Sequence, residues 1–205
     1  MANLSNVKLY YFDIGTRGYG QVLRYFLQDN NISYEDVRFK MEEWPSKRDE
    51  LIAANKMPAA TAPFIETSEG VYGRTLPILR RLSKSVPALK FENDDEEYYV
   101  DYAADVAYDW FTNYLYCNKG EQVKENYDKE RYAQHLDKME RVYAKNGGPY
   151  VLGDKISYAD YLVYHCLHRN NSLDLIQEKY PALAKFAAAF KERPNLKTYI
   201  ASLQD

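Results

Sequence analysis

Residues 7–39 read VKLYYFDIGTRGYGQVLRYFLQDNNISYEDVRF, and this stretch decides the fold class. Val7–Phe12 and Ile32–Phe39 are rich in β-branched and aromatic residues, which is typical of strands. Between them, Gln21–Asn30 repeats apolar residues at helical spacing, so these residues share one face. We therefore predict a strand, a helix and a second strand in succession.

Two further short strands follow. Pro63–Glu66 and Val71–Gly73 flank the turn sequence Thr67–Gly70, a pattern that predicts a hairpin. A helix is expected directly after it, with Thr75 as its N-terminal cap. Residues 40–62 are rich in turn-forming and charged residues and read as a loop. Strand–helix–strand followed by strand–strand–helix is the order of a thioredoxin-like α/β domain.

The second half of the chain is predicted to be all helical. Residues 83–95, SKSVPALKFENDD, combine proline, serine and clustered charge as linkers do. Amphipathic stretches follow at Glu96–Cys117, Glu121–Asn146, Pro181–Glu192 and Asn195–Leu203. We therefore assign a thioredoxin-like domain, a linker and an all-helical domain to residues 1–83, 84–95 and 96–205.

The clearest local signal in the helical half is a capping box. Ser157 is expected to cap the next helix, with Asp160 reaching back as its partner. A staple of Ile156 onto Tyr161 is expected beside it. We interpret Ser157 and Asp160 as folding residues only.

Composition and charge exclude several classes of function. No window approaches the roughly 18 consecutive apolar residues that a membrane span needs. A net charge of -3, with both signs interspersed, forms no broad positive face for nucleic acid. The start, MANLSNVKLYYF, carries no leader pattern, so a cytoplasmic location is expected. Cys117 and Cys166 are too few and too far apart for a disulfide framework or a metal site.

Tyrosine is unusually frequent, with 21 copies against 8 phenylalanines. One interpretation is that tyrosine takes positions where phenylalanine would serve, with each hydroxyl near water or a partner. The other interpretation is a surface built for association. The composition leaves both open.

Several motifs, through their order and spacing, resemble the glutathione transferases, and the sigma-like class most closely. They are LYYFDIGTRGYGQVLRYFL from Leu9, EEWPSKR from Glu42, APFIE from Ala62, GRTLPILRRL from Gly73, VDYAADVAYDW from Val100, VLGDKISYADYLV from Val151 and FKERPNLKTYIASL from Phe190. The resemblance covers nearly the whole chain. It implies a thioredoxin-like domain and a helical domain, glutathione as co-substrate, a hydrophobic electrophile and a homodimer.

The resemblance assigns the catalytic role to Tyr11, at the end of the first expected strand. A free thiol with a pKa of about 8.5 is mostly protonated at neutral pH, whereas the thiolate is the nucleophile. A hydroxyl that donates a hydrogen bond to the sulfur favours the thiolate and lowers the thiol pKa. The alternative is an ordinary strand aromatic. Tyr10 is expected to face the opposite side, because side chains alternate along a strand.

The resemblance assigns the binding of glutathione to other residues of the first domain. Ala62–Pro63 matches a cis-proline step where the residue before proline pairs its backbone with the tripeptide, and its place after a long loop favours cis. Thr75, with its hydroxyl at a helix N-terminus, suits the γ-glutamyl carboxylate, and Arg74 precedes it. Trp44 and Arg48 match positions that contact the glycyl end, although a lone loop tryptophan is more often a packing residue.

Three features depart from the family's pattern. Arg74 stands where glutamine is usual, and it attracts a carboxylate but cannot accept hydrogen bonds. Tyr19 stands where a second basic residue near the sulfur is usual, which implies weaker activation. Leu51–Thr61 is longer than usual and rich in alanine, so we expect the edge of the site to be remodelled.

In the helical half, Asp101, Asp105 and Asp109 recur every four residues and share one helix face. A solvated acidic stripe is the simple interpretation, and we keep it for Asp101. The resemblance implies that Asp109 reaches across a dimer interface to glutathione on the other subunit. Carboxylates on one helix are weak evidence for a metal, and no metal site is assigned. Candidates for contact with the electrophile are Tyr108, Trp110, Phe111, Tyr114 and Cys117.

Two functions follow. The first is a glutathione transferase that activates the thiol for attack on small electrophiles, with conjugation, isomerisation and peroxide reduction all open. The second is a non-catalytic transferase-fold subunit of a larger protein assembly, since a fold does not fix a function. Tyr19, Arg74, the altered loop and the tyrosine content favour the second function, and the ordered set of motifs favours the first.

Overall fold

The computed structural model describes residues 6–117 and 131–203. Its contacts divide the chain into two compact units, Met1–Lys90 with Pro194–Asp205, and Phe91–Arg193. The first holds a four-stranded sheet with helices, and the second is helical. This is the predicted fold class, a thioredoxin-like part and an all-helical part. Within the described ranges, no helix is both long enough and apolar enough to cross a bilayer.

Four strands form one mixed sheet in the order β2–β1–β3–β4. β1 (Val7–Phe12) pairs in parallel with β2 (Tyr34–Phe39) and antiparallel with β3 (Phe64–Thr67). β3 also pairs antiparallel with β4 (Gly70–Gly73). The predicted strands and hairpin are confirmed, with β2 starting later than Ile32. β1 is an inner strand, so a residue at its end has neighbours on both sides.

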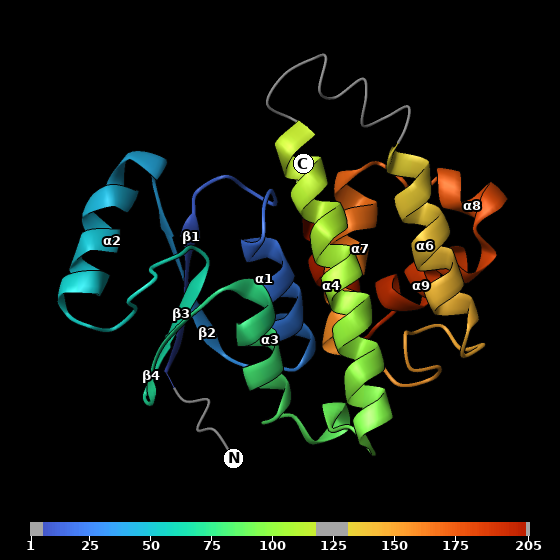
Figure 1. The fold of residues 1–205 in the computed structure, drawn as a ribbon, viewed down its shortest axis with the longest axis horizontal. Helices are drawn as coiled ribbons and strands as arrows, with labels where there is room; N and C mark the ends of the chain where they lie inside the picture. The colour runs from blue at the N-terminus through green and yellow to red at the C-terminus, as the bar shows by residue number, and fades with distance from the viewer. Residues whose placement is uncertain (1–5, 118–130, 204–205) are drawn as a thin grey trace. The chain divides into compact units, whose positions relative to one another are not determined.

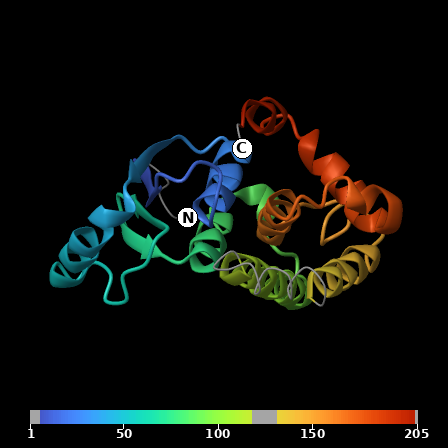
Figure 2. The same ribbon diagram turned by 90° about the horizontal axis from the view of Figure 1, so that it is seen from above.

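Helices cover both faces of this sheet (Figure 1). α1 (Gly20–Asp29) and α3 (Thr75–Ser83) lie on one face, and α2 (Trp44–Ala53) lies on the other. Figure 2 shows the same layers of this unit from above.

Alternation along β1 sends neighbouring aromatic residues to opposite faces of the sheet. Tyr11 is buried beside Gly20, the first residue of α1. Tyr10 and Phe12 instead pack into an aromatic cluster that includes Trp44 of α2. The prediction that Tyr10 and Tyr11 face opposite ways is confirmed.

The predicted loop between β2 and β3 is wrong over much of its length. η1 (Met41–Glu43), a turn of 3-10 helix, leads into α2, whose first turn contains Pro45. Proline fits there because the first N–H groups of a helix have no helical acceptor. No residue of α2 is fully buried, and its apolar residues form no continuous stripe. The lack of helical periodicity hides this helix from pattern analysis.

The predicted cap of α3 is also wrong. Arg74 occupies the N-cap position, and Thr75 is the first helical residue. Arg74 has a φ of 70°, a left-handed backbone conformation that is strained for a residue with a Cβ atom. Thr75 is 3% exposed.

The helical unit consists of α4 (Asp94–Cys117), α6 (Tyr132–Ala144), α7 (Tyr158–Arg169), α8 (Leu175–Lys179) and α9 (Pro181–Lys191). α4 packs along α7, and α9 packs against α6 and α8. The predicted first helix and α9 are confirmed, whereas α8 has no counterpart in the prediction. The predicted helix Glu121–Asn146 lies partly outside the described residues, and α6 confirms the rest. The predicted linker contains a 3-10 turn, η2 (Pro87–Leu89).

The last helix, α10 (Lys197–Ser202), packs with the sheet unit. Gln21 Nε2 donates a hydrogen bond to Tyr199 Oη at 3.1 Å. Asn195 Nδ2 donates to the carbonyl oxygen of Asp29 at 2.7 Å. Both contacts hold residues 195–199 against α1, the helix that follows the β1–α1 loop.

Asp160 organises the start of α7 from a fully buried position. Its Oδ2 accepts hydrogen bonds from the N–H and the hydroxyl of Ser157 at 2.7 and 2.8 Å. Its Oδ1 accepts from the Val151 N–H at 3.1 Å and from the Tyr143 hydroxyl at 2.8 Å. Burial raises the pKa of Asp160 above its usual value, although the four donors favour the carboxylate. The predicted capping box is confirmed.

We predict that Asp160→Ala lowers the free energy of unfolding by about 3–5 kcal/mol, because it leaves buried donors without an acceptor. Urea unfolding measures the change. Asp154→Ala is the matched control, since Asp154 is an exposed aspartate shortly before α7, and its expected effect is within about 0.5 kcal/mol. Equal losses in the two variants would contradict the role given to Asp160.

Candidate functional site

The ends of the strands bring most predicted site residues to one edge of the sheet. β3 is antiparallel to both of its neighbours, so its start lies beside the ends of β1 and β4. β2 is parallel to β1, so its end, which leads to α2, lies at the same edge. The residues that converge there are Tyr11 on β1, Ala62 and Pro63 before β3, and Arg74 and Thr75 after β4.

Tyr11 lies under the loop that joins β1 to α1. Its side chain is 5% exposed, and its hydroxyl oxygen accepts a hydrogen bond from the backbone N–H of Tyr19 at 3.1 Å. Gly18 and Gly20 flank this donor. A Cβ atom at Gly20 would lie 2.6 Å from Tyr11 Cγ, and one at Gly18 would overlap the hydroxyl oxygen. The loop therefore fixes the orientation of the phenol.

Tyr10 is held in a different way. Its hydroxyl donates to Glu66 Oε2 at 3.0 Å, and its ring stacks on Phe64 at 4.5 Å. Burial, and then the Glu66 carboxylate, raise the pKa of Tyr10 to about 12. Its hydroxyl hydrogen is thus engaged with Glu66. Tyr11 is the better placed of the two phenols for chemistry.

The Ala62–Pro63 peptide bond is cis, as the family resemblance implies. Pro63 is buried and Ala62 is partly exposed. In the segment before it, the Thr61 N–H donates to Met57 Sδ at 3.3 Å. Met57 also packs closely on Gly73, where a Cβ atom would lie 2.7 Å from Sδ. Met57 therefore connects the segment before β3 to the end of β4.

The start of α3 offers backbone donors beside this proline. The Ile78 N–H donates to the Arg74 carbonyl oxygen at 3.0 Å, and Pro77 has no N–H. Thr75 and Leu76 therefore supply the N–H groups that lack a helical acceptor. Together with the positive end of the helix dipole, these groups suit a carboxylate.

Trp44 is partly buried among aromatic rings rather than free in a loop. It stacks on Phe39 at 6.0 Å and meets Phe12 edge-on at 6.0 Å. Arg48, one turn further along α2, is exposed and pairs with Asp49 at 2.8 Å. These contacts support a packing role for Trp44, and the contact of either residue with glutathione stays a prediction.

Four residues that shape this edge were not predicted from the sequence, namely Gly18, Gly20, Met57 and Gly73. The available signal was the sequence Gly-Tyr-Gly at the start of the first helix, since glycine permits a close approach of backbone to another group. The packing of Met57 on Gly73 had no local signal, because the two residues belong to different segments.

Asp101, Asp105 and Asp109 belong to α4 in the helical unit. Asp101 is partly exposed and accepts a hydrogen bond from the hydroxyl of the buried Tyr158, so it contacts another helix as well as solvent. Asp105 and Asp109 are exposed, and the role of Asp109 stays a prediction. Among residues 6–117 and 131–203, no three His, Cys, Asp or Glu side chains gather as metal ligands would.

The five candidates for contact with the electrophile differ in burial. Trp110 and Phe111 are fully buried, and Cys117 is 6% exposed, so these three belong to the core of the helical unit. Tyr108 and Tyr114 are partly exposed. These two tyrosines therefore have surface available for a ligand.

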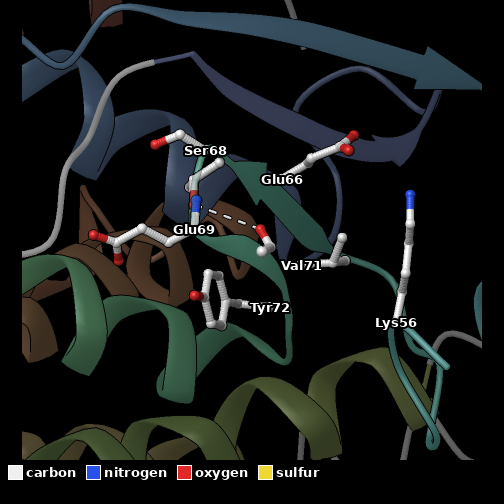
Figure 3. A pocket seen from close by; sticks show the side chains of 8 residues that line it. Lys56, Glu66, Ser68, Glu69, Val71 and Tyr72 are labelled. Carbon is white, nitrogen blue, oxygen red and sulfur yellow. Dashed lines mark hydrogen bonds between the residues drawn. The ribbon is translucent and has the colours of Figure 1, made fainter.

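A hollow of about 500 Å³ lies at the β3–β4 hairpin (Figure 3). Lys56, Glu66 and the hairpin residues 67–72 line it, and none of the predicted glutathione residues does. The Arg81 guanidinium lies 3.9 Å from the centre of the Tyr72 ring and donates to Glu69 at 2.5 Å. The hairpin wall is thus held by a contact with α3, away from Tyr11.

A second hollow, of about 240 Å³, lies in the helical unit and is lined by residues of α4 and α6 with Lys145. The Lys145 ammonium lies 4.0 Å from the centre of the Tyr99 ring. Arg141 and Lys145 stand at the C-terminal end of α6, where cations interact favourably with the helix dipole. The basic lining therefore has a structural explanation.

The sequence and the structure of this chain are similar to those of known proteins of one family. Residues 104–203 match the family model "Glutathione S-transferase, C-terminal domain". A Caenorhabditis elegans protein named glutathione S-transferase P is 32% identical over 204 residues, covering 95% of this chain and 91% of the relative. The chain belongs to the glutathione S-transferase family.

Other relatives agree with this assignment. The solved Pi-class glutathione S-transferase of Onchocerca volvulus is 29% identical, with a TM-score of 0.83 over 96% of this chain and 92% of that structure. Human hematopoietic prostaglandin D synthase is 26% identical, covering 95% of this chain and 100% of the relative. These relatives carry both Pi-class and prostaglandin-synthase names, so the sigma-like class of this transferase stays a prediction.

We predict effects of different size for two substitutions in α2 on the stability of this transferase. Trp44→Ala lowers the free energy of unfolding by about 2–3 kcal/mol, because it removes a half-buried ring from the cluster. Arg48→Ala changes it by less than about 0.5 kcal/mol, because the side chain is exposed. Urea unfolding measures both. A loss below about 1 kcal/mol for Trp44→Ala would contradict its packing role.

Proposed function

We propose that this family member is a glutathione transferase in which Tyr11 activates the glutathione thiol for attack on small hydrophobic electrophiles. The observation that carries the proposal is the state of the Tyr11 hydroxyl. It lies at the edge where the strand ends converge, and its oxygen accepts a hydrogen bond from a backbone N–H. A phenol oxygen carries one hydrogen and can donate it to a sulfur atom while it accepts a hydrogen bond from another group.

Donation from Tyr11 favours the charged form of the thiol and so lowers its pKa below the free value of about 8.5. More thiolate is then present at neutral pH, and the thiolate is the nucleophile. The activation step moves one proton from the thiol to solvent. The phenol keeps its proton and stabilises the sulfur anion throughout.

The remaining residues of this edge are proposed to hold the tripeptide. The backbone of Ala62, before the cis Pro63, is suited to pair with the cysteinyl portion as an added strand. The N–H groups at the start of α3 and the Thr75 hydroxyl are suited to the γ-glutamyl carboxylate, with Arg74 adding positive charge. Arg48, exposed on α2, is proposed for the glycyl carboxylate, with Trp44 beside it.

The reaction class is the finer part of the proposal. Relatives named glutathione S-transferase favour conjugation, and the relative named prostaglandin D synthase makes isomerisation the second candidate. The shared naming of these relatives favours an enzyme over a non-catalytic subunit. A homodimer, with Asp109 directed to glutathione on the other subunit, belongs to the same proposal and rests on the family resemblance.

We predict that Tyr11→Phe binds glutathione but ionises its thiol poorly. The pKa of bound glutathione should return toward about 8.5, and turnover with a chlorinated aromatic electrophile near neutral pH should fall about 100-fold. Ultraviolet absorbance of the thiolate against pH gives the pKa, and calorimetry gives the affinity.

Tyr10→Phe is the matched control for this experiment, since it removes a phenol hydroxyl from the next residue on the opposite face. We expect its thiol pKa to equal that of the wild type. Absence of glutathione binding at millimolar concentration in the wild type would overturn the proposed function. An unchanged thiol pKa in Tyr11→Phe would overturn the role of Tyr11.

A second prediction concerns Thr75. Thr75→Val keeps the shape of the side chain but removes the hydroxyl, so we expect glutathione affinity to fall about tenfold through one lost charge-assisted hydrogen bond. Thr75→Ser keeps the hydroxyl and should bind within about threefold of the wild type. Calorimetry with both variants decides, and equal affinities would remove Thr75 from the site.

A further inference from the structure

We propose that Gly18, Tyr19 and Gly20 are positioning residues for Tyr11, acting through backbone and close packing rather than through a side chain. The proposal rests on the proposed function of Tyr11 as the thiol activator. The Tyr19 N–H directs the hydrogen of the Tyr11 hydroxyl. The absence of a Cβ atom at Gly18 and Gly20 lets the backbone of the β1–α1 loop pass close to the Tyr11 ring.

The hydrogen bond from Tyr19 constrains the direction of the phenol hydrogen. A phenol oxygen carries one hydrogen and can accept as well as donate. With the Tyr19 N–H at 3.1 Å from Oη, the hydroxyl hydrogen must rotate away from that donor. An oxygen that accepts a hydrogen bond also becomes a stronger donor, because linked hydrogen bonds polarise one another. The N–H therefore both aims and strengthens the bond that Tyr11 gives to sulfur.

The two glycines permit this contact for different reasons. Gly18 has a φ of 76°, and a Cβ atom there would overlap Tyr11 Oη. Gly20 has no such backbone requirement, but a Cβ atom there would lie 2.6 Å from Cγ of the buried ring. Glycine is thus needed at position 20 only because the Tyr11 ring packs so closely against its backbone.

This arrangement explains how Tyr19 can act on Tyr11 although it replaces the basic residue usual at this position. The donor to Tyr11 is a backbone group, so it does not depend on which side chain position 19 carries. Positioning of the phenol therefore survives the loss of the basic side chain.

The direct test compares Tyr19→Pro with Tyr19→Ala. Tyr19 has a φ of -68°, which is the value that proline imposes, so proline removes the N–H without changing this angle. Tyr19→Ala also loses the tyrosine side chain but keeps the N–H. Tyr19→Pro puts its Cδ atom in place of the N–H beside Tyr11 Oη, so the difference between the variants reports the loss of the N–H together with this new contact.

The first readout needs no glutathione. The pKa of the Tyr11 phenol is measured by NMR with tyrosine labelled at Cζ, and the signal is assigned by its loss in Tyr11→Phe. A hydrogen bond from the N–H favours the phenolate, so the phenol pKa should be higher in Tyr19→Pro than in Tyr19→Ala. The second readout is kcat for conjugation, expected to be about two- to tenfold lower in Tyr19→Pro.

The glycines are tested with a control from the same loop. Gly15 has a φ of 65°, and no atom lies within 4 Å of the position its Cβ would take. Gly15→Ala therefore carries backbone strain like that of Gly18→Ala without touching Tyr11. We expect Gly18→Ala and Gly20→Ala to lower kcat about 100-fold, with glutathione affinity within about threefold, and Gly15→Ala to keep kcat.

The outcomes separate this proposal from the proposed function. Equal phenol pKa values in Tyr19→Pro and Tyr19→Ala would overturn the role of the N–H, even if Tyr11→Phe abolishes thiol activation. Unchanged kcat in Gly20→Ala would overturn the role of the close approach. If Tyr11→Phe leaves the thiol pKa unchanged, the proposed function fails, while the phenol pKa still reports whether the loop positions Tyr11.

Discussion

The closeness of the β1–α1 loop to the Tyr11 ring is the constraint on which the proposed chemistry depends. Tyr11 ends an inner strand, on the face covered by α1, and it is buried at 5% exposure. A buried phenol needs a partner for its oxygen, and the Tyr19 N–H supplies it. That bond forms only if the chain passes directly over the ring, which Gly18 and Gly20 allow.

The sheet extends this constraint to the rest of the candidate site. Parallel pairing with β2 and antiparallel pairing with β3 bring the cis Pro63 and the start of α2 to the edge where Tyr11 stands. The hairpin then returns the chain, so that Thr75 begins α3 at the same edge. One strand end thus brings together the proposed thiol activator, the proposed backbone pairing site and a helix N-terminus. These are the three elements that an acidic, thiol-bearing tripeptide requires.

The strands, α1 and the order of elements could be predicted because each follows a local rule. Alternation fixed the opposite faces of Tyr10 and Tyr11, and the reciprocal bonds of Ser157 and Asp160 follow from the capping-box pattern. The Tyr11 position itself came from a family resemblance. Strand chemistry alone would have left it an ordinary aromatic residue.

The features that could not be predicted from sequence patterns depend on contacts between segments far apart in the sequence. α2 lacks a buried stripe, so no periodicity marks it. Asp101 matches a solvated stripe in sequence, but Tyr158 from another helix donates to it. Buried tyrosines such as Tyr143 and Tyr161 favour the simpler reading of the tyrosine content, in which phenols fill core positions. The close packing of Gly20 against Tyr11 is a property of the folded loop and has no counterpart in composition or periodicity.

A crystal structure of the protein with bound glutathione is the most direct measurement. We predict that the glutathione sulfur lies within hydrogen-bonding distance of Tyr11 Oη, about 3.5 Å or less, while the Tyr19 N–H still donates to the same oxygen. Glutathione bound elsewhere, or a sulfur atom out of reach of Tyr11 with the loop in place, would contradict it.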